Sequence, residues 1–522
     1  MKNLFNIILL IIIALAGSSC QDGYLEEKVY SDLNTDGFFT SESDLSSALV
    51  GCYDALQADS YYGHSVLFLN DFPTEYMRGY WSNPMDVYTV TSALSDDVNQ
   101  RDVSSLWQHT WTANNCCNMV INRATDIDMD EDVKTEIVAE ARFLRALNRF
   151  NQVRFYGTNI PLIDSETTSL DDLDVEVSNS EALYASIIAD FEFAEENLPS
   201  TSSNGTATSW AATAYLAKVY LKLAGYSEDP STGEMVKGDN SNYAKAKIYL
   251  DKIIDQGPFG LMDKPIDVWG GQHNETEDNK EVIFAIKYET GGLDEGHAMT
   301  PRFAGKGNGW LAYTYKTLST TWEFYNSFED GDLRATNDML KITYQDKNQN
   351  WKNDDYPHCW KYVSDYDSTF TNNWSATSGG DYGDDIVLVR YADILLMDSE
   401  VENQISGLSE NSLSGINQVR LRAGVPAYTV GDVSAMTEIN QETPGSDKEK
   451  LQELIIVERK KELMCEGHGW FDYVRNNILM REMSKYYEYG DFNVAENKKS
   501  NLYPIYIVDI GLNENLTQNW GW

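Results

Sequence analysis

One segment, EDVKTEIVAEARFLRALNRFNQVRFY at residues 131–156, constrains the fold more than any other part of this 522-residue chain. Its apolar residues recur every three or four positions, which predicts a long amphipathic helix. The apolar face of that helix carries Val133, Ile137, Ala141, Leu144, Leu147 and Phe150. Gly157 predicts the end of the helix, and Pro161 follows it. The segment therefore indicates a chain built mainly on helices.

Further segments continue the helical pattern on both sides of this one. Helices are predicted at 104–124, 181–198, 208–224 and 242–256, and helical periodicity returns at 386–405, 411–423 and 448–466. The runs WAATAYLAKVYL and YAKAKIYL alternate small Ala with Tyr and Leu at helical spacing. This pattern resembles tetratricopeptide helix pairs, in which small residues let neighbouring helices approach. Because the period is irregular, a generic Ala-rich helical bundle remains the alternative.

Two long stretches, at about 59–103 and 257–385, interrupt the helical pattern. The second is rich in Gly, Asn, Asp and Trp and contains one strand-like run, EVIFAIKY at 281–288. Long irregular excursions from a regular scaffold are more often functional than not. We therefore expect the binding residues of this protein in these two stretches.

Aromatic residues make up 12% of the chain, with 32 Tyr and 13 Trp, so part of them must lie at the surface. A sugar ring has an apolar face of C–H bonds and a rim of hydroxyl groups. Tyr and Trp stack on such a face, while acids, Asn and Arg hydrogen-bond the hydroxyls. Loops that combine these residue types therefore predict a site for a neutral oligosaccharide.

Two loop clusters have this mixture, and a third has it more weakly. The first runs from Asp71 to Tyr88, the second is NGWLAYTY at 308–315, and the third is NNWSATSGGDY at 372–382. Trp81 is predicted as the main stacking platform because the indole has the largest face, and Tyr76 is the member of this cluster that we would first assign to the core instead. The predicted ligand-binding residues are Asp71, Arg78, Tyr80, Trp81, Asn308, Trp310, Tyr313 and Trp374. The alternative is that these aromatic rings pack against the scaffold or a partner.

The N-terminus, MKNLFNIILLIIIALAGSSC, predicts a secretory signal at residues 1–19. The apolar run from Leu4 to Ala16 is too short for a membrane span, and small residues end it. Cys20 directly after these small residues makes the segment look like a bacterial lipoprotein signal, with lipidation at Cys20. An ordinary signal followed by a chance cysteine is the alternative.

The net charge of −42 argues against nucleic acid and against polyanionic ligands, because the field of the protein repels them.

Five cysteines follow Cys20: Cys52, Cys116, Cys117, Cys359 and Cys465. Their number is odd and they contain no CxxC pair, so we expect small core residues and not a disulfide framework.

No catalytic motif stands out in the sequence. With 82 acidic residues, any pair of carboxylates is uninformative, and the chain has no GxSxG, HExxH or Walker motif. His468, between Glu466 and Asp472, lies in a helix-end motif and is expected to be structural. The sequence therefore predicts a binding protein without enzyme activity and without a cofactor.

Several charged motifs favour structural roles. The stretch DKNQNWKNDD at 346–355 begins like a calcium loop but has Trp351 where Gly is needed and Pro357 in place of Glu. No metal site is therefore predicted, although a structural cation in the irregular half remains an alternative. The stretch DGD at 330–332 and the following Arg334 are expected to form an acid–Arg pair that fixes a loop. Arg145 and Arg149 are expected to pack and pair, and the run ERKKEL at 458–463 predicts a solvated helix face.

Several blocks together resemble one family, the SusD/RagB-like outer-membrane lipoproteins of Bacteroidetes. The block AEARFLRALNRFNQVRFYGTNIPLI (139–163) closely resembles the most recognisable helix of that family and its exit. Other similar blocks, in consistent order, lie at 23–56, 281–288, 328–334, 387–403, 416–424, 458–475 and 502–522. His468–Gly469 stands where the family commonly has Arg after Glu-Gly.

The resemblance implies a mostly α fold, in which tetratricopeptide-like helix pairs form a superhelical scaffold for an irregular, loop-rich binding half. It implies one domain over residues 20–522, anchored by lipid to the cell surface at the outer membrane. The family pairs with a SusC-like TonB-dependent transporter, to which its members deliver oligosaccharides, or peptides in some cases. Its binding residues lie in loops that correspond roughly to the first two aromatic clusters.

Overall fold

The computed structural model describes twelve stretches of the chain. They are residues 38–79, 101–167, 174–202, 204–269, 279–289, 295–297, 299–303, 318–335, 339–345, 350–362, 382–484 and 500–522. The signal at 1–19 and the lipidation site Cys20 lie outside these residues, so both remain predictions. Among the described residues, no helix is long and apolar enough to cross a membrane.

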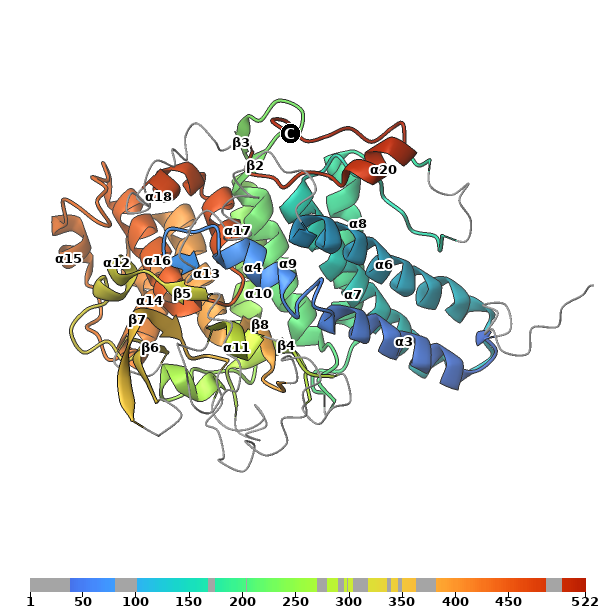
Figure 1. Ribbon diagram of the computed structural model, residues 1–522, viewed down its shortest axis with the longest axis horizontal. Helices are drawn as coiled ribbons and strands as arrows, with labels where there is room; N and C mark the ends of the chain where they lie inside the picture. Colours follow the sequence, from blue (N-terminus) through green and yellow to red (C-terminus); the bar gives the residue numbers. More distant parts are fainter. Residues whose placement is uncertain are drawn as a thin grey trace, which may run out of the picture.

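The first part of the described chain is a series of helices, each packed against the next. Figure 1 shows them side by side, and the contacts join α3 to α6, α6 to α7, α7 to α8, α8 to α9 and α9 to α10. Their bounds are α3 Glu42–Gln57, α6 Arg101–Arg123, α7 Glu131–Tyr156, α8 Ser180–Asn197, α9 Ser209–Ala224 and α10 Ser241–Gln256. The helices predicted at 104–124, 131–156, 181–198, 208–224 and 242–256 are thereby confirmed.

Local sequence explains where these helices begin and how closely they approach. The Asp130 side chain accepts hydrogen bonds from the backbone N–H groups of Asp132 and Val133, and so caps the N-terminus of α7. At the other end, Gly157 has a φ of 79°, which only glycine adopts without strain. The small residues predicted to allow close packing are fully buried in α9, at Ala211, Ala212, Ala214 and Ala217.

The second part of the chain has fewer long helices, and α13 Tyr391–Ser406 connects it to the first. Helix α13 packs on α10 and also on α14 Glu410–Arg422 and α16 Asp447–Leu463. The predicted helices at 411–423 and 448–466 correspond to α14 and α16. The remaining helical segments are α4 Ser65–Asp71, η2 Ala124–Asp126, η4 Pro265–Trp269, α11 Met299–Phe303, α12 Trp322–Asn326, α15 Val430–Ala435, α17 Gly469–Arg475, α18 Leu479–Ser484 and α20 Ile507–Leu512.

The described strands form four separate antiparallel pairs. They are β1 Met77–Gly79 with β5 Leu318–Thr320, β2 Tyr226–Glu228 with β3 Met235–Lys237, β4 Val282–Ile286 with β8 Ile386–Arg390, and β6 Leu340–Gln345 with β7 Trp351–Cys359. Strand β4 confirms the strand-like run at 281–288. The helical prediction for 386–405 is wrong over its first five residues, because the β-branched run IVLVR pairs with β4 and all five side chains are buried.

One cluster of buried apolar residues runs through both parts of the molecule, from Leu45 to Leu516. This continuity supports the proposal of a single domain. The five described cysteines are free thiols, four of them buried and Cys116 half-buried, as expected for small core residues. The pairing expected of the α7 arginines is also confirmed, because Arg145 Nε lies 2.7 Å from Asp190 and Arg149 lies 2.7 Å from Asp164.

Candidate ligand-binding site

The first aromatic cluster opens at Asp71, the last residue of α4, and continues in a loop, residues 72–76, that is held tightly against the C-terminal part of the chain. The Asp71 carboxylate accepts hydrogen bonds from the backbone N–H groups of Gly467, at 2.6 Å, and Gly469, at 3.2 Å. It also accepts a hydrogen bond of 2.9 Å from the Tyr76 hydroxyl. A Cβ atom on Gly469 would lie 2.5 Å from that hydroxyl oxygen, so this close approach requires glycine.

These contacts correct the expected role of Asp71. Its side chain is 2% exposed, and its oxygens already accept three hydrogen bonds from the protein. Burial raises its pKa to about 6, although the N–H groups of Gly467 and Gly469 oppose that shift. Asp71 therefore anchors the loop instead of facing a ligand. Tyr76, the ring of this cluster first in line for the core, is 2% exposed and does lie in the core.

Glu75 provides a second anchor for the same loop. Its carboxylate lies 2.9 Å from Lys460 Nζ on α16 and accepts a hydrogen bond of 2.5 Å from the Tyr473 hydroxyl on α17. Both partners are nearly 400 positions further along the chain. The sequence pattern could not identify Glu75, Lys460 and Tyr473 as a unit, because nothing local links them.

The loop leads into β1, whose pairing bears directly on the predicted site. In the β1–β5 pair, Met77 lies opposite Thr320, Arg78 opposite Ser319 and Gly79 opposite Leu318. Because the strands are antiparallel, the chain leaves β1 after Gly79 at the same end at which it enters β5. The first aromatic cluster continues directly after Gly79, and the second cluster ends three residues before Leu318.

Most of the predicted ligand-binding side chains are not part of the described structure. Arg78 lies in β1, but nothing is described of its side chain. The predicted residues outside the described stretches are Tyr80, Trp81, Asn308, Trp310, Tyr313 and Trp374. For these six residues, and for Arg78, contact with a ligand remains a prediction.

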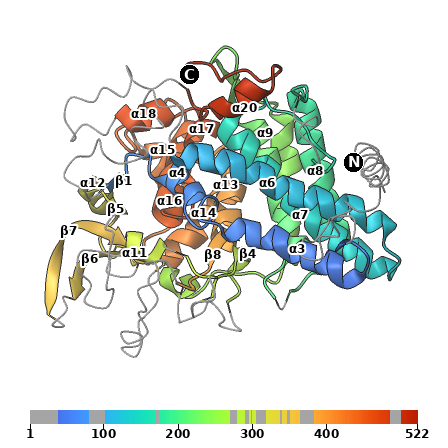
Figure 2. The ribbon, with the colours of Figure 1, turned by 45° about the vertical axis from the view of Figure 1, so that its right-hand side comes forward.

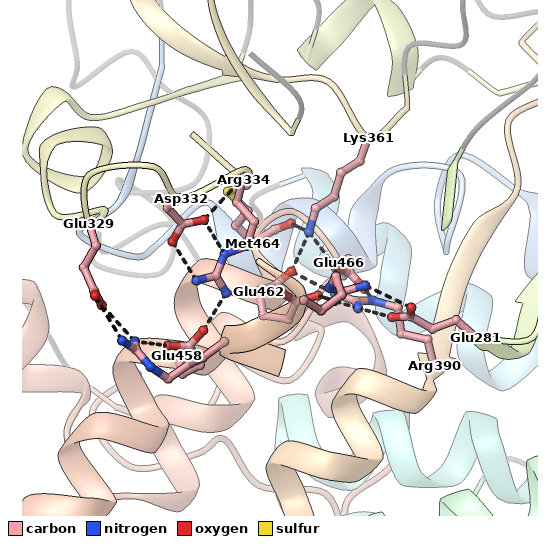
Figure 3. Close-up of polar contacts among 12 residues, drawn as sticks. Glu281, Glu329, Asp332, Arg334, Lys361, Arg390, Glu458, Glu462, Met464 and Glu466 are labelled. Carbon is pink, nitrogen blue, oxygen red and sulfur yellow. Dashed lines mark hydrogen bonds and ion pairs between the residues drawn. The ribbon is translucent and has the colours of Figure 1, made fainter. Parts of the chain in front are cut away.

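The segment that binds this loop is itself part of a network of buried charges, which is drawn in Figure 3. At one end of it, Lys361 Nζ donates to the backbone carbonyls of Glu462 and Met464 and lies 2.6 Å from a Glu466 oxygen. Arg390, at the end of β8, contacts carboxylate oxygens of Glu466 and Glu462 at 2.7 Å. Residue 466 directly precedes Gly467, whose N–H group binds Asp71, so the network and the loop anchor are continuous.

The network extends from Glu462 along α16 to a second group of segments. Arg334 is fully buried and lies 2.7 Å from Asp332, 2.6 Å from Glu458 and 3.2 Å from Glu462. Further members are Glu281, which contacts Arg390 and Arg422, and Glu329, which contacts Arg420. The acid–Arg pair predicted for DGD at 330–332 and Arg334 is confirmed, and Asp332 supplies the acid.

The prediction of a solvated face for ERKKEL is wrong. In α16, Glu458 is 1% exposed and Glu462 is fully buried. Although burial opposes ionisation of Glu462, the guanidinium groups of Arg422 and Arg390 hold its pKa well below the usual range. Charges as deeply buried as these persist only where partners neutralise them, and here the partners come from distant segments.

The described residues contain no group of three or more His, Cys, Asp or Glu side chains arranged to hold a metal ion. The charged residues of the network are paired with one another, so they hold distant segments together. His468 has its pKa lowered to about 3, chiefly by burial, and is neutral at ordinary pH.

Comparisons with known proteins agree on one family. Residues 333–522 match the model of the SusD family, and residues 23–221 match a model described as starch-binding and associating with the outer membrane. SusD-like protein P2 of Formosa agariphila is 26% identical over 491 residues, covering 89% of each chain.

Solved structures share the fold over nearly the whole length. A laminarin-binding SusD-like protein superimposes with a TM-score of 0.71 at 20% identity, covering 92% of this chain and 100% of its own. A structure described as containing a xylogluco-oligosaccharide superimposes with a TM-score of 0.69 at 20% identity, covering 91% of this chain and 98% of its own. These likenesses establish a mostly helical, SusD-like fold.

Proposed function

The chain belongs to the SusD/RagB-like family, and from that premise we propose that it captures neutral oligosaccharides at the outer surface of the cell. In this proposal the protein is anchored in the outer membrane through lipid on Cys20. It delivers its ligand to a SusC-like TonB-dependent transporter and does not cleave it. The relatives described as laminarin-binding and as bound to a xylogluco-oligosaccharide support this class of ligand.

The observation that carries the proposal is the register of the β1–β5 pair. Gly79 lies opposite Leu318, 239 positions further along the chain, so the two aromatic clusters join the described structure at one point. Two anchors, Asp71 on Gly467 and Gly469, and Glu75 on Lys460 and Tyr473, fix that point to the rest of the protein. A fixed base lowers the entropy lost when aromatic side chains stack on a ligand.

The assignment of residues within the site rests on chemistry and position. Trp81 is proposed as the main stacking platform, with Tyr80, Trp310 and Tyr313 completing an arc and Trp374 at its edge. Arg78 and Asn308 are proposed to hydrogen-bond the hydroxyl groups. The acidic protein, with a net charge of −42, tolerates a neutral glycan but repels a sulfated one.

Titration calorimetry with laminarin and with a xylogluco-oligosaccharide tests the proposal. Trp81→Ala is expected to weaken binding by about 1–3 kcal/mol if the indole is a stacking anchor. Trp520→Ala is the matched control, because it removes an exposed indole near the C-terminus, far in sequence from both aromatic clusters. Unchanged affinity in Trp81→Ala would refute the site assignment. Binding of peptides but of no glycan would favour the peptide-import alternative, and release of shorter sugars would indicate an enzyme.

A further inference from the structure

A cavity of about 350 Å³ opens between α6 and the C-terminal helix α20, in the helical part of the molecule. Figures 1 and 2 show these two helices side by side and away from the β1–β5 pair. The volume lies at the lower end of the roughly 300–1,000 Å³ that small-molecule sites occupy. Its lining includes Trp107, Trp111, Asn115, Asp509, Leu512 and Leu516.

The walls of this cavity are held in place by contacts between distant segments. Trp107 Nε1 donates a hydrogen bond of 2.6 Å to Asp509 Oδ2, which fixes α20 against α6. The rings of Trp107 and Trp111 meet edge to face, with centroids 5.6 Å apart. The backbone N–H of Thr167 donates to Asn115 Oδ1 at 2.8 Å, which ties the segment around Thr167 to α6. The cavity is therefore formed before any ligand arrives.

Two polar groups of the lining keep unused hydrogen-bonding capacity. Asn115 uses its Oδ1, but its Nδ2 makes no hydrogen bond to any residue in the described part of the chain. Asp509 uses Oδ2 for Trp107, and among the described residues nothing donates to its Oδ1. The half-buried side chains of Asn115 and Asp509 thus offer one donor and one acceptor beside indole and aliphatic surfaces.

This combination selects one class of ligand. A hydroxyl group both donates and accepts, so neighbouring hydroxyls of a sugar satisfy Asp509 and Asn115 together. An anion would meet the Asp509 carboxylate and a net charge of −42, and an ammonium group could not accept from Asn115. The apolar C–H face of a sugar ring suits the indole of Trp111 and the side chains of Leu512 and Leu516.

We propose that this cavity is a second carbohydrate site, which binds one or two rings of a neutral saccharide between α6 and α20. The inference rests on the proposed function, because it assigns the same ligand class to a separate place. A second site would let one molecule hold a glycan at two points, which raises avidity without strengthening either contact.

Fluorine NMR of the full chain labelled with 5-fluorotryptophan tests this site directly. The resonance that disappears in Trp111→Phe is assigned to Trp111. Glucose, galactose, mannose and xylose are then titrated into the Trp81→Ala protein, in which the proposed first site is disabled. We expect the Trp111 resonance to shift and saturate with at least one of these sugars.

Two conservative variants check the polar contacts. Asn115→Asp keeps the acceptor for Thr167 but removes the Nδ2 donor. The affinity for the sugar that shifts the Trp111 resonance should therefore fall by roughly 3- to 10-fold. Asn122→Asp introduces the same charge on the same helix, outside the cavity lining, and should leave that binding unchanged.

The outcomes separate this inference from the proposed function. If laminarin or the xylogluco-oligosaccharide binds the unmutated protein, while no sugar shifts the Trp111 resonance, the second site is refuted and the first stands. If calorimetry detects no binding of either oligosaccharide and no monosaccharide shifts the Trp111 resonance, both proposals fail. An equal loss of sugar affinity in Asn115→Asp and Asn122→Asp would also refute the second site, because a general effect of the added charge would then explain the loss.

Discussion

The helix-pair scaffold, residues 42–256, and the ion-network region, residues 281–466, are held together in different ways. In the scaffold, successive helices from α6 to α10 pack together largely through apolar and small side chains, such as the fully buried alanines of α9, and the Arg145–Asp190 pair joins α7 to α8. In the ion-network region, segments far apart in sequence meet through buried charges centred on Arg390 and Glu462. Buried ion pairs between specific residues can therefore hold irregular segments in place where no helix–helix packing does so.

The largest predicted loss of stability follows from removing one buried charge of the network. Glu462→Gln removes the charge that Arg390, Arg422 and Arg334 share, and leaves buried cations without compensation. We expect a loss of about 3–5 kcal/mol in the free energy of unfolding, measured by urea denaturation. Glu136→Gln, on the exposed face of α7, is the matched control and should stay within about 0.5 kcal/mol. Similar small losses in both variants would show that the network contributes no more than surface charges do.

Acid should also act on the ion-network region. His297 is buried, with one ring nitrogen 2.6 Å from the carbonyl of Asp384 and the other accepting from the N–H of Met299. Burial lowers its pKa from 6.5 to about 4, so between these values the unfolded chain binds more protons than the folded one. Stability therefore falls on acidification through that range, by roughly 2–3 kcal/mol for this residue.

Urea denaturation of His297→Asn at a series of pH values checks this effect. The variant should lose stability less steeply than the parent between pH 6.5 and 4. Asp71 has the opposite effect on stability. Its pKa is raised to about 6 in the folded protein, so below that pH the folded state binds more protons than the unfolded chain, and acid stabilises it. The comparison must therefore be made between variant and parent, and equal slopes would contradict the prediction.

The scaffold should be sensitive to volume where the ion-network region is sensitive to charge. Ala214 is fully buried in α9, which packs on both α8 and α10. Ala214→Leu is expected to cost about 1–3 kcal/mol in the free energy of unfolding, because the neighbouring helices must move apart. Ala244→Leu, on the exposed side of α10, is the control and should be nearly neutral. A neutral Ala214→Leu would show that close helix approach is not what stabilises the scaffold.

The same contrast explains what the sequence could predict. Helix α7 was expected at 131–156 and is observed at Glu131–Tyr156, because its periodicity, its cap and its terminal glycine are all local signals. The family resemblance added the overall architecture. The ERKKEL run was predicted wrongly because helical periodicity cannot show that residues 334, 390 and 422 supply partners for it.

Asp71 illustrates the same limitation of local sequence within the predicted site. A carboxylate among aromatic residues is typical of a sugar contact, and nothing in the sequence around Asp71 indicated that its side chain is buried. Its role depends on the N–H group of Gly467, which lies 396 positions away. Of the candidate site, the sequence predicted the loops and the residue types, but it could not predict which members of the cluster turn inward.

The smallest predicted effect tests whether the two regions differ only in their tertiary contacts. Thr208 caps α9 in the scaffold, where its hydroxyl accepts from the N–H of Ala211 at 3.2 Å. Ser446 caps α16 in the ion-network region, where its hydroxyl accepts from the N–H of Glu449 at 3.3 Å. Each bond is local, so Thr208→Ala and Ser446→Ala should each cost about 1 kcal/mol in urea denaturation. A loss in Ser446→Ala as large as that in Glu462→Gln would mean that the start of α16 and the buried charges form one cooperative unit.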